Sequence, residues 1–211
     1  MKERPILFSG PMVRAILSGT KTQTRRILKL KWGFDFEERD DGTLWPWAEH
    51  PDCDDDVWMP CPQGEIGDRL WVRETHMNWW KLDPANPEGP RIFSHVAAFA
   101  ADGYELEPGE RWIPSIHMLR AASRITLDIK AVRVERLQDI SEEDAKAEGA
   151  PGYEEGLDAP PPDGDHEWSY RASFQRLWEQ INGPGAWAKN PWVWVVEFER
   201  AQAQQKGPHE G

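Results

Sequence analysis

The chain has 211 residues, of which 39% are hydrophobic, and its formal net charge is −12. This length is typical of one domain, which we expect over residues 1–200. The negative charge argues against a partner such as double-stranded DNA. No apolar run approaches the roughly 18 residues of a membrane helix, so we expect no membrane association. Two cysteines cannot hold a secreted scaffold together, and the first residues lack an apolar signal core, so we expect a cytoplasmic protein.

The charge is unevenly distributed along the chain. Residues 1–31 hold eight basic side chains against one acidic side chain, Glu3, a net of +7 that leaves −19 for the remainder. A local basic region in an acidic protein suits one phosphate or one short single strand better than a duplex. We therefore expect a small-molecule nucleoside or a short single-stranded RNA as partner.

The first half of the chain predicts few regular elements. Residues 9–19 predict a short helix, with Ser9 as N-cap and Gly19 as the residue that ends it. Residues 33–64 are rich in Asp, Gly and Pro and predict a long surface loop or insertion. Residues 69–75 alternate like a strand, and residues 78–110 predict a second insertion.

The second half predicts a more regular structure. Residues 124–137 have the strongest strand pattern, and their length suggests a bulge or bend near Lys130 and Ala131. The elements expected after it are a helix from Ser141 to Gly149, a loose insertion over 150–165, a helix over 166–182 capped by Asp165, a strand over 191–200 and a flexible tail over 201–211. Short strands, long loops and two or three flanking helices predict an α+β domain built around a small barrel.

The turn that follows the first predicted helix concentrates reactive groups. Between Gly19 and Arg26 the chain has one amine (Lys21), three threonine hydroxyls and the guanidinium groups of Arg25 and Arg26. Arginine matches phosphate and carboxylate geometry. A lysine amine can act as a base beside a hydroxyl when burial or neighbouring cations lower its pKa. The alternative from the residues alone is a solvated basic turn.

This segment resembles a known signature. Gly19-x-Lys21-x-x-Thr24-x-Arg26 is similar to the G-x-K-x-x-[ET]-x-R signature of the ASCH domain superfamily, whose fold is a PUA-like β-barrel. Residues 67–72 (GDRLWV) resemble the second element of that superfamily, and residues 137–149 (LQDISEEDAKAEG) resemble its third. The extended form of this chain, with WVRET, PSIHM and NPWVWV, is similar to ASCH proteins found in phages and prophages.

The resemblance implies a candidate activity. Small bacterial members of the superfamily are amidohydrolases that remove the acetyl group from N4-acetylcytidine with a Lys, a Thr and a Glu. Matched motif by motif, these residues fall on Lys21, Thr24 and Glu148. Thr24 or a water would attack the acetyl carbonyl, Lys21 would take the proton, and Glu148 would orient Lys21 or pass a proton to the leaving nitrogen. Other members bind RNA or act as ribonucleases, so a non-catalytic RNA or modified-base binding module and a ribonuclease remain alternatives.

Further candidates for ligand binding come from their polarity and position. Arg25 and Arg26 lie in the first motif, Arg26 being suited to an oxyanion or a ring oxygen. Arg73 and Glu74 end a predicted strand, where a polar pair could line a barrel rim, and Glu74 is the second choice for the catalytic acid. His117 and Arg124 are weaker candidates. For each of these the alternative is an ordinary structural or surface role.

The possible metal ligands in the sequence match no standard metal site. His50, Cys53, Cys61 and His76 are zinc-type ligands, but their spacing matches no standard finger. The acidic run at residues 54–56 lacks the arrangement of a calcium loop. No phosphate-binding loop or dinucleotide fingerprint is present. We expect no metal and no cofactor. Tryptophans in the predicted loops either stack on a base or pin those loops to the barrel.

Overall fold

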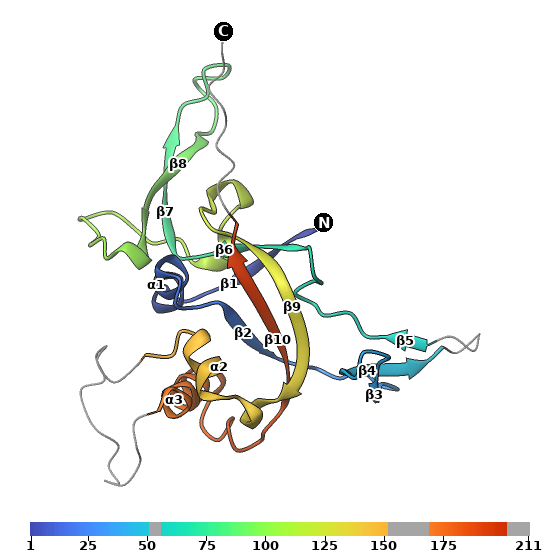
Figure 1. Cartoon of the computed structure of the whole chain (residues 1–211). Coiled ribbons are helices and arrows are strands. Elements are labelled where there is room, and N and C mark those ends of the chain that lie inside the picture. The colour runs from blue at the N-terminus through green and yellow to red at the C-terminus, as the bar shows by residue number, and fades with distance from the viewer. Residues whose placement is uncertain (51–55, 152–168, 202–211) are drawn as a thin grey trace, which may run out of the picture.

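The protein is an α+β domain in a computed structural model that describes residues 1–50, 56–151 and 169–201. Its centre is a five-stranded sheet in the order β1-β6-β9-β10-β2, in which β1 and β6 run parallel and every other pair is antiparallel. The strands are β1 (Glu3–Leu7), β6 (Arg69–Arg73), β9 (Thr126–Arg136), β10 (Trp192–Arg200) and β2 (Gln23–Ile27). Figure 1 shows β9 and β10 as the two long curved strands at the centre of the molecule.

The central sheet is open rather than a closed barrel. Its two edges are β1 and β2, and no backbone ladder joins them within the described ranges. One side chain spans the gap, because Arg26 Nη2 donates to the Leu7 carbonyl at 2.9 Å. The expected α+β class is confirmed, but in place of the expected small barrel the described strands form an open sheet whose β1 and β2 edges are linked through an arginine.

The first predicted helix is confirmed as α1 (Gly10–Ser18). Gly19 follows it with φ 81°, the left-handed conformation that ends helices and favours glycine. Val13 and Ile16 are the buried residues of this helix. The predicted strand irregularity is also confirmed: the β9–β10 register shifts between Glu197 and Phe198, which pair with Ala131 and Ile129, so Lys130 is the extra residue of a bulge.

Two helices cover one face of the sheet near its β2 and β10 side. They are α2 (Glu142–Ala147) and α3 (Tyr170–Asn182). Ser141 caps α2, as predicted, by accepting from the backbone N–H of Asp144 at 3.0 Å. Ser169 caps α3 in the same way. The predicted cap Asp165, most of the predicted insertion at 150–165 and nearly all of the predicted tail lie outside the described residues.

The prediction of a loop over residues 33–64 is wrong for the part of it that the structure describes. A three-stranded antiparallel sheet lies there, made of β3 (Asp35–Glu38), β4 (Leu44–Glu49) and β5 (Asp56–Trp58). The centres of the Phe36 and Trp192 rings are 4.4 Å apart, and those of the Trp45 and Trp194 rings are 4.9 Å apart. These aromatic contacts bury one face of the small sheet on the main core, which the polar composition of the segment conceals.

The insertion predicted over residues 78–110 is not an irregular loop in its first part. Strands β7 (His76–Lys81) and β8 (Ile92–Phe99) form a hairpin that projects from the domain (Figure 1). Phe93, Val96 and Phe99 pack on a buried cluster around Trp71 and Met118. Four single-turn 3-10 helices complete the connections: η1 (Ala100–Asp102), η2 (Ser115–His117), η3 (Arg120–Ala122) and η4 (Leu137–Asp139).

The main sheet has a hydrophobic core on each face. The larger core includes Trp194, Val196 and Ile129 together with residues of α1 and the small sheet. The smaller core joins Val193 and Val195 to α2 and α3. Among the described residues, no helix has the length and apolarity needed to cross a membrane.

Candidate functional site

Lys21 is an enclosed lysine whose ammonium has three acceptors. Its side chain is 0% exposed. Nζ donates to the backbone carbonyl of Gln23 at 2.8 Å, to the backbone carbonyl of Glu148 at 2.7 Å and to Glu148 Oε2 at 2.9 Å. The structure therefore places the first-motif lysine in direct contact with the glutamate of the third motif.

The local backbone explains this meeting of distant segments. Lys21 and Glu148 form an antiparallel β-bridge, and the neighbouring Thr22 N–H donates to the Ala147 carbonyl at 2.8 Å. Gly149 follows with φ 76°, and a Cβ there would lie 3.1 Å from Lys21 Cβ. A glycine at this position allows the end of α2 to approach the turn closely.

Arg25 is a buried arginine held by three carboxylates. Its guanidinium is 0% exposed and donates from Nη1 to Glu148 Oε1 at 3.1 Å. The other nitrogens donate to Glu135 and Asp144. Strand alternation turns Arg25 toward the carboxylates of β9 and α2, where it fixes the position of Glu148.

Arg25 belongs to a charge network that the sequence analysis missed. Arg133 donates to Glu135 Oε2 at 3.1 Å and to Asp144 Oδ2 at 2.9 Å, and it also pairs with Glu197. Arg133 and Glu135 are two positions apart on β9, so they share one face of the sheet. That alternation of charges within a buried strand was the available signal. The network holds Glu148 between two cations, Lys21 and Arg25.

A small cavity reaches this network from outside. It measures about 60 Å³ and is lined from β2 by Thr24, Arg25 and Arg26, by Glu148, and from α1 and α3 by apolar side chains together with Asn182. Lys21 is not among the lining residues, so Glu148 connects the cavity with the lysine. Thr24 is buried, at 4% exposure, and lines the cavity beside Glu148.

Burial lowers the pKa of two cations near Glu148, Lys21 and Arg26. Removal from water lowers the pKa of Lys21, while the Glu148 carboxylate opposes that change. Burial likewise lowers the pKa of Arg26, again opposed by Glu148. The Arg26 guanidinium lies over the Phe8 ring at 5.4 Å and Lys21 Nζ lies over the same ring at 5.5 Å. The cations therefore lie close to Glu148 in a water-poor environment, where charge interactions are strong.

Glu74 and Arg124 form a second cluster, separate from the first. Arg124 donates to both carboxylate oxygens of Glu74, at 2.9 and 3.0 Å, and to both of Asp102, at 2.8 and 2.7 Å. Burial opposes ionisation of Arg124, but these hydrogen bonds outweigh it and raise its pKa. No contact in the described residues joins this cluster to Lys21, Thr24 or Glu148.

Arg73 and His117 are also apart from the first cluster. Arg73 lies over the Trp71 ring at 4.7 Å and donates to the Ile116 carbonyl at 3.2 Å. His117 is exposed on η2. The structure thus brings together Lys21, Thr24, Arg25, Arg26 and Glu148 and does not join the other four candidates to them.

The residues weighed as metal ligands do not gather. Cys53 lies outside the described residues, Cys61 is a buried thiol that donates to Gln63 at 3.3 Å, and His76 is fully buried with its Nδ1 3.1 Å from the Glu74 carbonyl. Burial lowers the pKa of His76. Within the ranges that the structure describes, no three His, Cys, Asp or Glu side chains are placed to hold a metal ion.

Comparisons with protein-family models, with curated proteins and with solved structures gave no match.

Proposed function

We propose that this protein is an amidohydrolase of the ASCH type that removes a small acyl group from a modified nucleoside such as N4-acetylcytidine. In this proposal the open sheet is the counterpart of the PUA-like barrel, and the contact of Arg26 with the Leu7 carbonyl takes the place of a ladder between β1 and β2. One observation supports it most: Glu148, hydrogen-bonded to the buried Lys21 at 2.9 Å, lines the same cavity as Thr24 and Arg26.

The proposed chemistry begins with a proton transfer. Glu148 Oε1 and Oε2 each keep a lone pair beside the cations that hold them, so the carboxylate can accept the proton of the attacking group. That group is the Thr24 hydroxyl or a water that Thr24 positions. Lys21 keeps the carboxylate in place through its hydrogen bond to Oε2.

The carbonyl oxygen then develops negative charge. Arg26 lines the cavity with a half-buried side chain, and a cationic donor placed at a developing oxyanion stabilises it. Glu148 returns its proton to the leaving nitrogen as the C–N bond breaks. Where the Thr24 hydroxyl attacks, a water then hydrolyses the acetyl ester formed on its oxygen and releases acetate. In sum, by either route, the amide and one water give acetate and the free exocyclic amine, with no cofactor.

The size of the cavity limits what enters it. About 60 Å³ equals the space of roughly two waters, well below the roughly 300–1,000 Å³ typical of a pocket that encloses a whole ligand. An acetyl group fits, whereas a nucleoside ring has to lie outside. The half-exposed Ile181 on α3 and Ile27 on β2 offer an apolar surface at that mouth.

The direct experiment incubates the protein with N4-acetylcytidine and follows cytidine by chromatography. We expect turnover by the natural protein and a loss of about 100-fold or more with Lys21→Met, because the carboxylate loses its lysine partner. Lys189→Met, a change at an exposed lysine, is the matched control and should retain activity. Thermal unfolding of both variants shows whether the loss comes from misfolding.

A second candidate function has one specific observation in its favour. All three protons of the Lys21 ammonium are already donated to fixed acceptors, an arrangement that also suits a purely structural lysine beneath a binding surface. A non-catalytic module for RNA or a modified base would retain N4-acetylcytidine or single-stranded RNA without turnover. Cleavage of the RNA would instead indicate a ribonuclease.

A further inference from the structure

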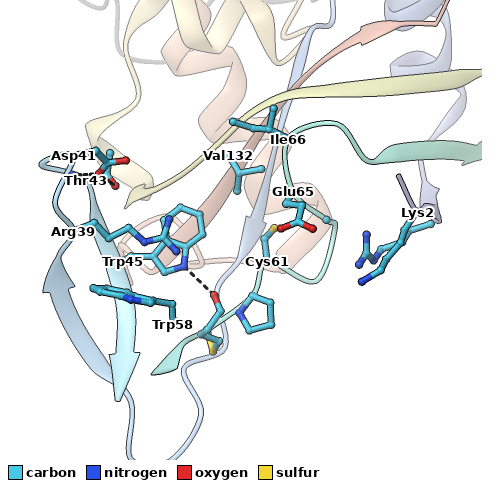
Figure 2. A pocket seen from close by; sticks show the side chains of 14 residues that line it. Lys2, Arg39, Asp41, Thr43, Trp45, Trp58, Cys61, Glu65, Ile66 and Val132 are labelled. Atoms are coloured by element: carbon cyan, nitrogen blue, oxygen red, sulfur yellow. Dashed lines mark hydrogen bonds between the residues drawn. The ribbon is translucent and has the colours of Figure 1, made fainter. Parts of the chain in front are cut away.

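A second and much larger hollow lies away from Glu148, between the three-stranded sheet and residues 59–66. It measures about 620 Å³, within the range of roughly 300–1,000 Å³ that small ligands occupy. Figure 2 shows Arg39, Trp45 and Trp58 on one side of it and Lys2 on the other. None of its lining residues lines the small cavity at Thr24.

One wall of this hollow is a fixed platform for stacking. The Arg39 guanidinium lies 3.7 Å from the centre of the Trp45 ring and 5.1 Å from that of Trp58. Trp45 is held from behind, because its Nε1 donates to the Met59 carbonyl at 2.9 Å and its ring contacts Trp194. Trp58 remains half-buried. A planar guanidinium and a partly open indole both stack on aromatic rings.

The same hollow gathers positive charge in an acidic protein. Lys2, Arg4 and Arg39 line it against Asp41 and Glu65. A neighbouring hollow of about 390 Å³ shares Arg4 and the wall at residues 59–61, and its charged lining residues, Arg4, Lys29 and Lys31, are all cations. In the part of the chain that the structure describes, only Arg4 of these five cations forms a salt bridge, with Asp68. Arg39 lies against the two tryptophan rings and near Asp41, and Lys2, Lys29 and Lys31 remain to attract an anionic ligand.

Asp41 adds an acceptor of fixed orientation. Its Oδ1 accepts from the Thr43 hydroxyl at 2.5 Å and from the Thr43 backbone N–H at 2.9 Å. These hydrogen bonds hold the pKa of Asp41 below its usual range, so the carboxylate stays charged near neutral pH. A charged carboxylate beside a stacking wall can accept from an amino group or a ribose hydroxyl.

We propose that this hollow binds a nucleoside phosphate: its base stacks on the Arg39–Trp58 wall, and its phosphate faces Lys2, Arg4 and the adjoining lysines. The combination of an aromatic platform, unpaired cations and one fixed acceptor matches a ligand with an aromatic ring, hydroxyls and an anionic group. This site is independent of the reaction proposed at Glu148. It assigns a function to the three-stranded sheet, which lies outside the ASCH-like motifs.

The test is isothermal titration calorimetry of the full chain with cytidine and adenosine 5′-monophosphates, inorganic phosphate, and a short single-stranded oligonucleotide. We expect both nucleotides to bind and affinity to fall with added salt. We expect Arg39→Ala to weaken binding about tenfold. Lys31→Glu, at an exposed position, should weaken binding about threefold without disturbing the fold.

The controls separate this site from the rest of the molecule. Lys81→Ala, an exposed lysine on the β7–β8 hairpin, and Thr24→Val should both leave the affinity unchanged. Tighter binding of the oligonucleotide than of the mononucleotides would identify the ligand as one nucleotide of a single strand, and equal binding would identify a free nucleotide. Binding of inorganic phosphate alone, no binding of any nucleotide, or binding unaltered by both Arg39→Ala and Lys31→Glu would overturn the proposal.

Discussion

Glu148 and Glu74 are two buried carboxylates held by arginine, and Glu148 lines the small cavity beside Thr24. Glu148 is 3% exposed and Glu74 is 1% exposed. Glu74 binds Arg124 through both oxygens, in a cluster that ends at Asp102. Glu148 divides its oxygens between an arginine and a lysine and lines a cavity beside a hydroxyl. Burial and ion pairing are common to both carboxylates, so the proposed catalytic role of Glu148 depends on its place in the cavity beside the Thr24 hydroxyl.

The largest effect is expected from Glu148→Gln. The change leaves Lys21 and Arg25 facing a neutral amide, so we expect the free energy of unfolding to fall by about 3 kcal/mol. Deacetylation should fall by about 1,000-fold, because the carboxylate that accepts the proton is gone. Urea unfolding gives the first value and cytidine release gives the second. Activity near the natural level in a folded Glu148→Gln protein would contradict the proposed difference between Glu148 and Glu74.

Thr24→Val separates chemistry from stability. Valine keeps the shape of threonine and leaves the pairing of residue 24 with Val196 in the sheet intact, so the free energy of unfolding should change by less than about 1 kcal/mol. The rate should fall by about 100-fold, because the cavity loses its hydroxyl. Thr24→Ser, which keeps a hydroxyl, is the matched variant and should retain most of the activity. Equal rates for the valine and serine variants would remove Thr24 from the reaction.

Glu74→Gln should lower the stability of the fold and leave the rate of deacetylation nearly unchanged, the reverse of Thr24→Val. Arg124 would keep Asp102 but lose a buried partner, so we expect a loss of about 2 kcal/mol in the free energy of unfolding. The rate of deacetylation by the folded fraction should stay within about twofold of the natural rate, because no described contact joins Glu74 to the cavity. A selective loss of activity in this variant would move the catalytic acid to the second cluster.

The smallest effect concerns stability in acid. Asp68 accepts from the Lys2 backbone N–H at 2.6 Å and from Arg4 at 2.5 Å, which lowers its pKa to about 2. An unfolded Asp has a pKa of about 3.9. The lowered value stabilises the fold fully above about pH 4, and this contribution is lost as pH falls toward 2. Urea midpoints measured at a series of acidic pH values should therefore fall less steeply for Asp68→Asn than for the natural protein.

Local chemistry made part of the fold predictable. Ser141 and Gly19 mark helix ends because caps and left-handed glycines act over a few residues. The long pattern in β9 predicted both the strand and its bulge. Phe36 and Trp45 were not recognised as strand residues, because their partners Trp192 and Trp194 lie far along the chain. The polar residues around them favoured a loop.

The site was predictable in its members but not in their arrangement. The similarity to a signature pointed to Lys21 and Glu148, which the structure places in contact. Arg25 and Arg26 are neighbours in sequence, yet alternation along β2 gives one to the carboxylate network and the other to Phe8 and Leu7. The third partner of Arg25, Glu135, comes from another strand, and sequence spacing alone does not reveal such a pairing.

The most direct test of the central claim, that Glu148 and Thr24 share a reactive cavity, is the simultaneous measurement of acetate and cytidine released from N4-acetylcytidine by the natural protein and by Thr24→Val. We predict equimolar release of the two products by the natural protein and a rate about 100-fold lower for the variant, at similar stability. Absence of both products with the folded natural protein, or equal rates for the two proteins, would contradict it.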